Sequence, residues 1–204
     1  MSVMIIDYGM GNLQSVYRTF EECGAEVFIS NDPGSLKLAT HIILPGVGTF
    51  SDAMKNLKNL NWPVAIVNEV KNGKPLLGIC LGMQLLAEKG YENEETDGLG
   101  LIKGQVIKLK PQSSEIRIPH VGWNEVHQKV KNKLFSNIPD NSDFYFVHSY
   151  HFVPESDSNI LSTTPYCNSF VSSVYCNKIF GVQFHPEKSG KFGFQVIKNF
   201  LSIY

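Results

Sequence analysis

The sequence predicts an α/β protein built on a central mixed, mostly parallel β-sheet with helices on both faces. In the first half of the chain, short apolar runs alternate with amphipathic segments, the pattern of a parallel sheet covered by helices. One apolar run ends in a Gly-x-Cys-x-Gly turn that leads directly into another helical pattern. The second half contains mainly short β-rich runs, which predict an extra antiparallel β region. With 204 residues and no long linker, we expect one domain over residues 1–204.

The first half of the chain is expected to alternate strands and helices. Strands are predicted at residues 3–6, 26–30, 41–44 and 76–79, helices at 13–23, 52–57 and 63–70, and one helical turn at 35–39. Gly24 and Gly73 end two of these helices, as glycine commonly does. Gly9 and Gly11 resemble part of a dinucleotide-binding turn, but Gln14 stands where the third glycine should be. We therefore predict no nucleotide site at this turn.

The second half is expected to be rich in strands. After a helix at 83–89, strands are predicted at 99–109, 116–118, 123–126, 144–152, 160–163, 171–176 and 179–184. The dipeptide Asn177-Lys178 separates the last two strands, and a two-residue link of this kind predicts a β-hairpin. A closing amphipathic helix is expected at 191–203.

Composition and charge argue against several kinds of partner and site. Lys and Arg number 18 against 19 Asp and Glu, and no basic stripe is present, so we expect no binding to nucleic acid or to a membrane surface. The start of the chain lacks the features of a signal peptide, and no apolar run approaches membrane-spanning length, which predicts a cytoplasmic protein. We expect no disulfide framework, metal site or cofactor, because no Cys-x-x-Cys pair occurs among Cys23, Cys80, Cys167 and Cys176.

Cys80 is the strongest candidate for a nucleophile. The segment Gly78-Ile-Cys80-Leu-Gly82 has the spacing of a nucleophile elbow between the strand at 76–79 and the helix that follows. Such a turn is strained, and Gly78 and Gly82 remove side chains that would clash there. A helix N-terminus and a nearby imidazole favour the thiolate, which is the attacking form. The alternative is a small buried core cysteine, so the rest of the chain must supply a base.

A base and its orienting group follow the last predicted strand. His185 and Glu187 are two residues apart, which in an extended chain directs both side chains to one face, and Pro186 restricts the backbone between them. A carboxylate beside an imidazole orients the ring and stabilises the imidazolium. Taken singly, His185 suits a half-buried strand position and Glu187 a solvated turn. Together with Cys80 they predict a catalytic triad of nucleophile, base and orienting group.

Several motifs together resemble those of the class I glutamine amidotransferases. Gly-Ile-Cys80-Leu-Gly-Met-Gln and Phe-His185-Pro-Glu187 are widely shared in that family. Five segments are similar to the narrower family of glutaminase subunits of imidazole glycerol phosphate synthases: Asp7-Tyr-Gly-Met-Gly-Asn12, Pro45-Gly-Val-Gly48, Pro119-His-Val-Gly-Trp-Asn124, Phe146-Val-His-Ser-Tyr150 and His185-Pro-Glu-Lys-Ser189. The likeness covers essentially the whole chain. Thr49 stands where a histidine is more common and Val121 where a methionine is, and neither position has a catalytic role.

The resemblance implies a three-layer fold and hydrolysis of L-glutamine to L-glutamate and ammonia through a cysteinyl thioester. Cys80 would attack the side-chain amide carbon, His185 would transfer the protons, and Glu187 would orient His185. The main-chain N–H groups of Val47 and Leu81 would form the oxyanion hole. Because glycines flank Val47, we also expect its peptide to be misaligned in the isolated subunit and rotated by a liganded partner.

The resemblance also implies a substrate site and a partner. Positions that hold glutamine in the family correspond here to Gly48, Gln84, Ser149 and Tyr150. The partner would be a (β/α)8-barrel cyclase subunit, joined as a heterodimer, that uses the ammonia to make imidazole glycerol phosphate and aminoimidazole carboxamide ribotide in L-histidine biosynthesis. Family positions near that interface correspond to Asn12, His120, Trp123, Tyr145 and Lys188. For Trp123 a place in the core is equally expected.

Three other interpretations are compatible with parts of this pattern. A paralogue could supply ammonia to a different synthase, such as a surface-glycan amidating enzyme, and only the partner or the genomic neighbours would distinguish it. A cysteine hydrolase of peptides or γ-glutamyl compounds would turn over without a partner. A non-catalytic scaffold would normally have lost Cys80, His185 or Glu187, and all three are present.

Overall fold

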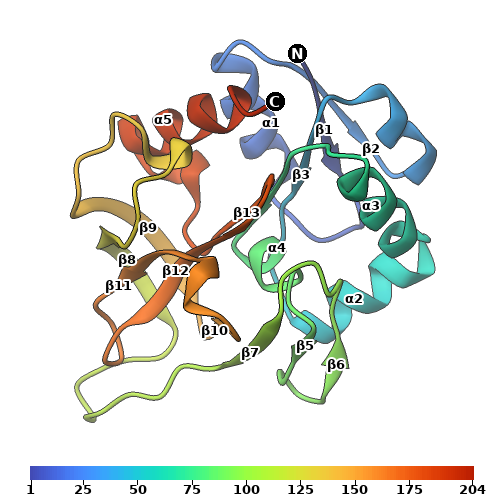
Figure 1. The fold of residues 1–204 in the computed structure, drawn as a ribbon. Coiled ribbons are helices and arrows are strands. Elements are labelled where there is room, and N and C mark those ends of the chain that lie inside the picture. Colours follow the sequence, from blue (N-terminus) through green and yellow to red (C-terminus); the bar gives the residue numbers. More distant parts are fainter.

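Five parallel strands form one half of a nine-stranded sheet. The computed structural model describes residues 1–204, and the strand order of its larger sheet is β2-β1-β3-β4-β13-β12-β11-β8-β9 (Figure 1). The parallel strands are β2 (Glu26–Ser30), β1 (Ser2–Ile6), β3 (His41–Leu44), β4 (Leu76–Ile79) and β13 (Ile179–Val182). Residues of β3, β4 and β13 are buried throughout. This burial on both faces explains why these runs are continuously apolar.

The other half of the same sheet is antiparallel. Its strands are β12 (Phe170–Cys176), β11 (Ile160–Thr164), β8 (His120–Gln128) and β9 (Ser142–His148). Asn177 and Lys178 link β12 to β13, and Asn177 has φ 55°, the left-handed conformation that such tight hairpin turns require. The predicted hairpin and the predicted antiparallel β region are both confirmed.

A second sheet of four short strands lies beside the elbow. Its order is β10-β7-β5-β6, made of β10 (Tyr150–Pro154), β7 (Gly104–Lys108), β5 (Lys89–Gly90) and β6 (Thr96–Asp97). β9 and β10 are separated only by Ser149, so the chain passes from the large sheet to the small one at that residue. Two strands from different sheets therefore meet at a position predicted to bind substrate.

Helices cover both faces of the large sheet and create two cores. α1 (Leu13–Glu22) and α5 (Gly190–Leu201) contribute to a buried cluster of 26 residues, whereas α2 (Phe50–Asn59) and α3 (Trp62–Lys71) contribute with the small sheet to a cluster of 25. Short 3-10 segments η1 (Pro33–Leu38), η2 (Lys133–Phe135), η3 (Asp157–Asn159) and η4 (Pro186–Lys188) complete the fold. Successive residues of one strand enter different clusters, as for Val3 and Met4 of β1. The sheet thus forms the middle of three layers.

The helix predicted at 83–89 is much shorter than expected. α4 spans Leu81–Gln84 only. The carbonyls of Leu85, Leu86 and Ala87, which a longer helix would use internally, accept hydrogen bonds from the N–H groups of residues 99–102. Residues 99–102 have therefore replaced the N–H groups that a longer helix would have offered to these carbonyls. The sequence around residues 83–89 does not predict this replacement.

Three predicted strands also differ from the structure. The run at 99–109 forms a strand only from Gly104, because residues 99–102 bond to the segment after α4. The run at 116–118 lies in a loop, where the Arg117 carbonyl accepts from the Tyr166 hydroxyl instead of from a neighbouring strand. The run at 144–152 is broken at Ser149 into β9 and β10.

None of the helices in this structure combines the length and the apolar character that a membrane crossing requires.

Candidate active site

Cys80 lies at the sharp turn between β4 and α4. Its backbone angles, φ 55° and ψ −112°, are unfavourable for a residue with a side chain. The flanking glycines make this turn possible, because a Cβ on Gly78 would lie 2.5 Å from the Gly82 carbonyl oxygen and a Cβ on Gly82 would overlap the carbonyl of Leu44. The strand, strained turn and helix start that define a nucleophile elbow are therefore present at Cys80.

His185 and Glu187 form a buried pair beside this turn. His185 Nδ1 lies 2.7 Å from Glu187 Oε1, and the two side chains are only 4% and 2% exposed. Because an ionised carboxylate can only accept, Nδ1 donates and Nε2 remains for another partner. The pair does not arise from an extended chain as expected: Glu187 lies in η4, and the turn of this 3-10 segment brings its carboxylate to the ring.

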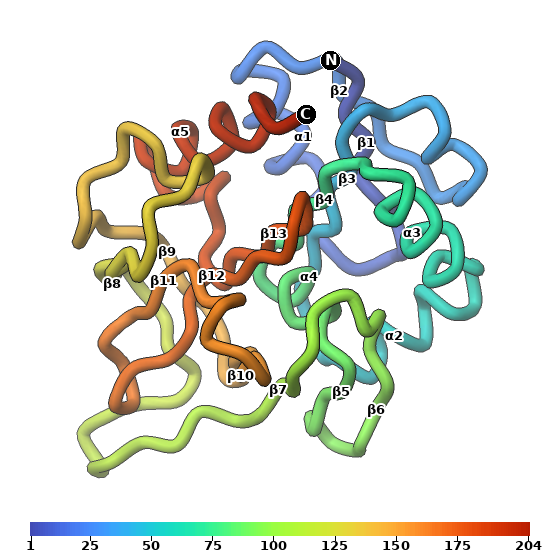
Figure 2. The backbone as a smooth tube through the Cα atoms, in the orientation of Figure 1, coloured from blue at the N-terminus to red at the C-terminus, as the bar shows by residue number.

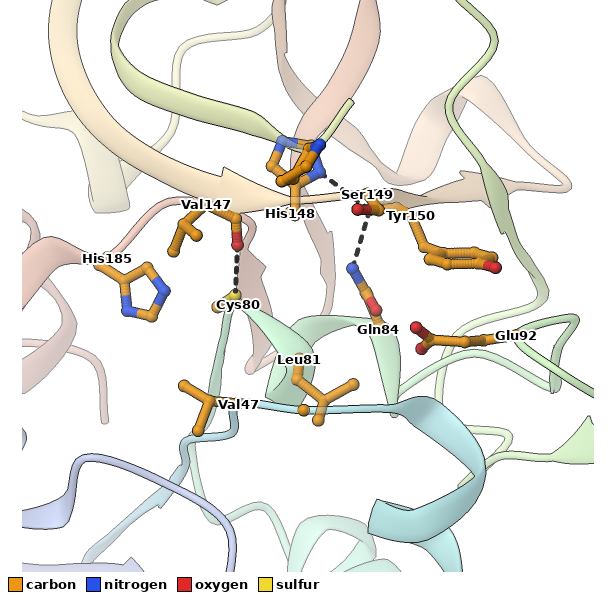
Figure 3. A pocket seen from close by; sticks show the side chains of 12 residues that line it. Val47, Cys80, Leu81, Gln84, Glu92, Val147, His148, Ser149, Tyr150 and His185 are labelled. Atoms are coloured by element: carbon orange, nitrogen blue, oxygen red, sulfur yellow. Dashed lines mark hydrogen bonds between the residues drawn. The ribbon is translucent and has the colours of Figure 1, made fainter. Parts of the chain in front are cut away.

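Neighbouring negative charge holds a proton on His185. Burial lowers the pKa of this imidazole, but the charge that Cys80 carries when ionised and the Glu187 carboxylate outweigh burial and raise the pKa of His185 to about 10. Nε2 is buried and forms no hydrogen bond of standard geometry, so Cys80 acts on it chiefly through charge. Figure 3 shows the His185 ring beside Cys80 at the wall of a cavity. An imidazolium beside a thiolate is the arrangement that activates a cysteine nucleophile.

Strand pairing brings these residues together from distant parts of the chain. β4 and β13 are parallel neighbours with Ile79 opposite Val182, and the Cys80 N–H donates to the Val182 carbonyl at 2.8 Å. Both strands run side by side through the centre of the molecule (Figure 2). The His185 N–H donates to the Tyr145 carbonyl at 2.9 Å, which ties the base to β9 as well. The predicted meeting of Cys80 and His185 follows from this shared sheet edge.

A second loop passes close to the elbow. The buried Tyr8 hydroxyl donates to the Pro45 carbonyl at 2.9 Å and so holds the Pro45-Gly-Val-Gly48 loop after β3. Burial and the charge of Cys80 raise the pKa of Tyr8, which keeps this donor protonated. Gly48 has φ 107°, a conformation that glycine adopts without strain. Val47 lies between these anchors and is 45% exposed.

A cavity of about 300 Å³ opens in front of Cys80. Its volume lies at the lower end of the range of small-molecule sites. Side chains and backbone from the elbow, the Pro45–Gly48 loop, the β9–β10 crossing and His185 converge on it (Figure 3). The predicted oxyanion and substrate residues all line it: Val47, Gly48, Leu81, Gln84, Ser149 and Tyr150.

Gln84 faces the cavity with its amide already engaged. Its Nε2 donates to the Tyr150 carbonyl and to Gln183 Oε1, each at 2.9 Å. Both hydrogens of the amide are used, so only Oε1 remains for a ligand. Gln84 therefore supports the cavity wall in addition to any role in binding substrate.

Three polar residues of the site, His148, Glu92 and Gln183, were not among those predicted. Glu92 is the one acidic side chain that lines the cavity, and its Oε2 accepts from the Phe50 N–H at 2.8 Å. Burial raises the pKa of Glu92. It belongs to an acidic loop with Glu94 and Glu95, and no pattern distinguishes it there. Gln183, fully buried behind Cys80, did have a signal: it is a lone polar residue in an apolar run before His185.

The predicted interface residues separate into exposed and buried positions. Trp123 is 57% exposed, its ring lies 6.1 Å from that of Tyr145, and Lys188 Nζ lies 5.6 Å from the Tyr145 ring. Asn12 is exposed and caps α1 through the Ser15 N–H. His120 is different: it is 3% exposed and packs within the molecule. His120 therefore does not lie on the surface of the free chain, because inward-facing positions of β8 alternate with the outward-facing Val121 and Trp123, and its place near an interface stays a prediction.

The other three cysteines are free thiols outside the cavity, and no cluster of three or more His, Cys, Asp or Glu side chains is arranged to hold a metal ion.

Known proteins share both the sequence and the fold of this chain. Residues 4–203 match the family model of class-I glutamine amidotransferases. The imidazole glycerol phosphate synthase subunit HisH of Aquifex aeolicus is 47% identical, over 98% of this chain and 96% of that protein. Subunit HisH 2 of Methanococcus maripaludis is 48% identical over 98% of each chain. The subunit HisH of Pelagibacter ubique is 43% identical over the full length of both.

Solved structures agree with the predicted fold. PurLQS from Thermotoga maritima superposes with a TM-score of 0.77 at 21% identity, over 98% of this chain and 97% of that one. A glutamine amidotransferase from the same organism gives 0.67 at 20% identity, over 98% and 82%. At these identities the likeness concerns the fold. The match over nearly the whole sequence is decisive for the family, and the chain belongs to the class-I glutamine amidotransferases.

Proposed function

We propose that this protein is the glutaminase subunit of an imidazole glycerol phosphate synthase, which hydrolyses L-glutamine to L-glutamate and ammonia. The observation that carries the chemistry is the strained Cys80 elbow beside the buried His185–Glu187 pair. The synthase assignment is supported by the names and the full-length similarity of the relatives.

In the proposed reaction, Cys80 and His185 act as a thiolate and an imidazolium. The thiolate attacks the side-chain amide carbon of glutamine, and His185 delivers its Nε2 proton to the departing nitrogen, which leaves as ammonia. The neutral imidazole then takes a proton from water as that water attacks the thioester. Collapse of the second tetrahedral intermediate releases glutamate and restores both charges. Glu187 keeps Nδ1 protonated and the ring oriented throughout.

The oxyanion of each intermediate requires donors on one side of Cys80. Leu81 is the first residue of α4, where a helix leaves its N–H groups without internal partners, and Val47 is the second donor. One such donor typically contributes about 3 to 4 kcal/mol to the transition state. We further propose that the Val47 peptide is misaligned in the free subunit and turns when the liganded partner binds, because Gly48 beside it can change conformation easily.

The amino-acid end of glutamine is proposed to lie toward Gly48, Gln84 and the Ser149–Tyr150 backbone. Glu92 faces the same part of the cavity (Figure 3) and supplies negative charge for the substrate ammonium. This arrangement selects free glutamine over a glutaminyl residue in a peptide, which has no ammonium group at that position.

The proposed partner is a (β/α)8-barrel cyclase subunit that receives the ammonia. Exposed Trp123 and Lys188 flank Tyr145, whose carbonyl holds His185, so the surface next to the base is suited to binding a protein. Ammonia released into bulk water would be protonated and lost as a nucleophile, so a closed passage between the two active sites favours the synthase reaction.

Glutamate formation by the purified chain, mixed with a cognate barrel subunit and its nucleotide ligand, tests this proposal. Cys80→Ala is expected to abolish glutamate formation while the complex still forms, because only the nucleophile is lost. Cys176→Ala, which removes a free thiol on β12, is the matched control and should retain full activity.

Glutamate formation by Cys80→Ala would contradict the chemistry, and full turnover without the barrel subunit would contradict the role given to Val47. Failure to bind or respond to the cyclase subunit, with glutamine still hydrolysed, would favour a paralogue that serves another synthase.

A further inference from the structure

A chain of buried amides connects the substrate wall of the cavity to the Cys80 sulfur. The Gln84 amide bridges the Tyr150 carbonyl and Gln183 Oε1, and Gln183 Nε2 lies 3.7 Å from Cys80 Sγ, within hydrogen-bonding distance of sulfur. The Gln183 side chain is completely buried, and the main-chain N–H of Gln183 donates to the Ser172 carbonyl at 2.9 Å. The proposed triad does not use Gln183.

The direction of each hydrogen bond in this chain is determined by the Tyr150 carbonyl. A carbonyl can only accept, so the Gln84 atom that faces it must be the amide nitrogen. The second hydrogen of that nitrogen then points at Gln183 and requires the oxygen of that amide. The Gln183 nitrogen is consequently turned toward Cys80, and the group presented to the sulfur is a donor.

Two buried histidines hold the Tyr150 carbonyl in place, His148 directly and His120 through His148. His148 Nδ1 lies 2.9 Å from that carbonyl and must donate to it, so His148 Nε2 accepts from His120 Nδ1 at 3.0 Å. Burial lowers the pKa of His148 to about 3 and that of His120 to about 4, which keeps both rings neutral. The carbonyl that orients Gln84 is therefore itself held in place.

We propose that Gln183 positions and stabilises the Cys80 thiolate, and that Gln84 orients Gln183 for this task. The inference rests on the proposed function, in which Cys80 is the nucleophile. A thiol can donate a hydrogen bond to the Val147 carbonyl 3.8 Å away, whereas a thiolate has no hydrogen to donate to that oxygen and can only accept. The Gln183 side-chain amide N–H offers the thiolate a donor at a fixed position, beside a cysteine that is only 5% exposed.

Alkylation of Cys80 by iodoacetamide, followed by mass spectrometry of the Cys80 peptide at a series of pH values, tests this inference without substrate or partner. In Gln183→Met, a variant of similar volume without the amide, the pH at which half of Cys80 is ionised should rise by about one unit, so the alkylation rate below that pH should fall about tenfold, the effect of losing a hydrogen bond to a charged group. At alkaline pH the rates should converge, because the thiol is then ionised in both proteins. A purely structural role would not produce this pH dependence.

The matched control is Gln128→Met, which removes an amide that donates to the Ile138 carbonyl at 2.9 Å, away from the cavity. It should leave Cys80 alkylation unchanged. Gln84→Met provides a second measurement if Gln183→Met does not fold, as judged by circular dichroism: it frees the Gln183 amide to rotate and should give a smaller loss of the same kind.

Alkylation of a folded Gln183→Met or Gln84→Met protein at the wild-type rate at every pH would overturn the inference. So would an equal loss in Gln128→Met. These outcomes are independent of glutamate formation, so the inference can fail while the glutaminase proposal holds, and the reverse.

Discussion

His185 and Glu92, at two ends of the cavity, differ in charge. On one side of Cys80, His185 carries positive charge that burial alone would remove, because two negative groups flank it. On the other side, Glu92 retains a hydrogen bond from the Phe50 N–H that favours its carboxylate form despite burial. The cavity therefore has a proton donor, His185, beside Cys80 and an acidic group, Glu92, where the substrate ammonium is proposed to bind. Such polarity suits a substrate with an amide at one end and an ammonium at the other.

Replacement of Glu92 by Gln should weaken glutamine binding rather than the chemical step. Gln preserves the size of the side chain and an acceptor for the Phe50 N–H, but removes the charge proposed to bind the substrate ammonium. We expect KM for glutamine to rise about tenfold with kcat changed much less, the signature of lost uniform binding. Steady-state glutamate formation measures both.

The exposed Glu94, two residues further along the same loop, gives the control for this prediction. Glu94→Gln makes the same loss of charge outside the cavity and should leave KM unchanged. A fall in kcat of Glu92→Gln with KM unchanged would refute the assigned role.

Among the elements, the β4–α4 elbow depends on contacts that only glycine permits. α4 approaches the end of β3 so closely that Gly82 touches the Leu44 carbonyl, and the same approach places the Pro45–Gly48 loop against the elbow. The short length of α4 has a different origin, since the chain beyond Gln84 bonds to residues 99–102. Nucleophile and oxyanion loop are therefore parts of one packed unit.

Gly82→Ala is expected to destabilise this unit strongly. The added methyl would overlap backbone that cannot move without separating α4 from β3, so the free energy of unfolding should fall by about 3 kcal/mol or more. Urea unfolding followed by circular dichroism measures the loss. Gly34→Ala adds a methyl that meets only the exposed Asp32 carboxylate at 3.3 Å, and it should change stability by much less. Equal stability of the two variants would contradict the packing argument.

In the molecule as a whole, burial or partial burial lowers the pKa of four histidines: His41, His120, His148 and His151. Burial lowers the pKa of His120 and His151 to about 4 and that of His148 to about 3. In the unfolded chain these imidazoles would take up protons near their ordinary pKa of about 6.5. Acid therefore favours the unfolded state, and the stability of the fold should be fully present above about pH 6.5 and decline as the pH falls toward the folded-state values.

His185 has the opposite effect on how stability depends on pH. Because its pKa is raised to about 10, its contribution to stability is present below about pH 6.5 and is lost as the pH rises through about 10. The free energy of unfolding should consequently be largest near neutral pH. At lower pH the imidazoles that the fold buries take up protons in the unfolded chain, and at higher pH His185 loses its proton.

His148→Gln should flatten the acid side of the stability profile. A single buried neutral histidine adds a slope of at most about 1.4 kcal/mol per pH unit between the two pKa values, and removal of His148 removes that slope. Unfolding by urea at several pH values between 4 and 7 measures it. His127→Gln, which removes an exposed imidazole paired with Glu125, should leave the slope unchanged. An unchanged acid slope in His148→Gln would show that this histidine does not stay neutral in the folded protein.

Local spacing in the sequence determined the features of this protein that depend on neighbouring residues. Glycines on both sides of Cys80 specify a strained turn, and a polar dipeptide at 177–178 specifies a hairpin. Alternation of apolar and amphipathic runs was enough to predict the parallel strands and the helices that cover them, because each element buries its own apolar face. The triad was predicted from its spacing, whereas the residues of the cavity wall that were named in advance came from the resemblance to a family.

Only the tertiary structure decided the features that arise between distant segments. Residues 99–102 end the helix after Cys80, β8 turns His120 inward, and two amides connect Tyr150 to the sulfur. Glu92 reaches the cavity from a loop that looks ordinary in the sequence. Each of these outcomes depends on which backbone or side-chain group is available across the fold, because burial strongly favours a hydrogen-bond partner for a polar group. Which groups become partners depends on how the whole molecule packs, so a short stretch of sequence predicts little of it.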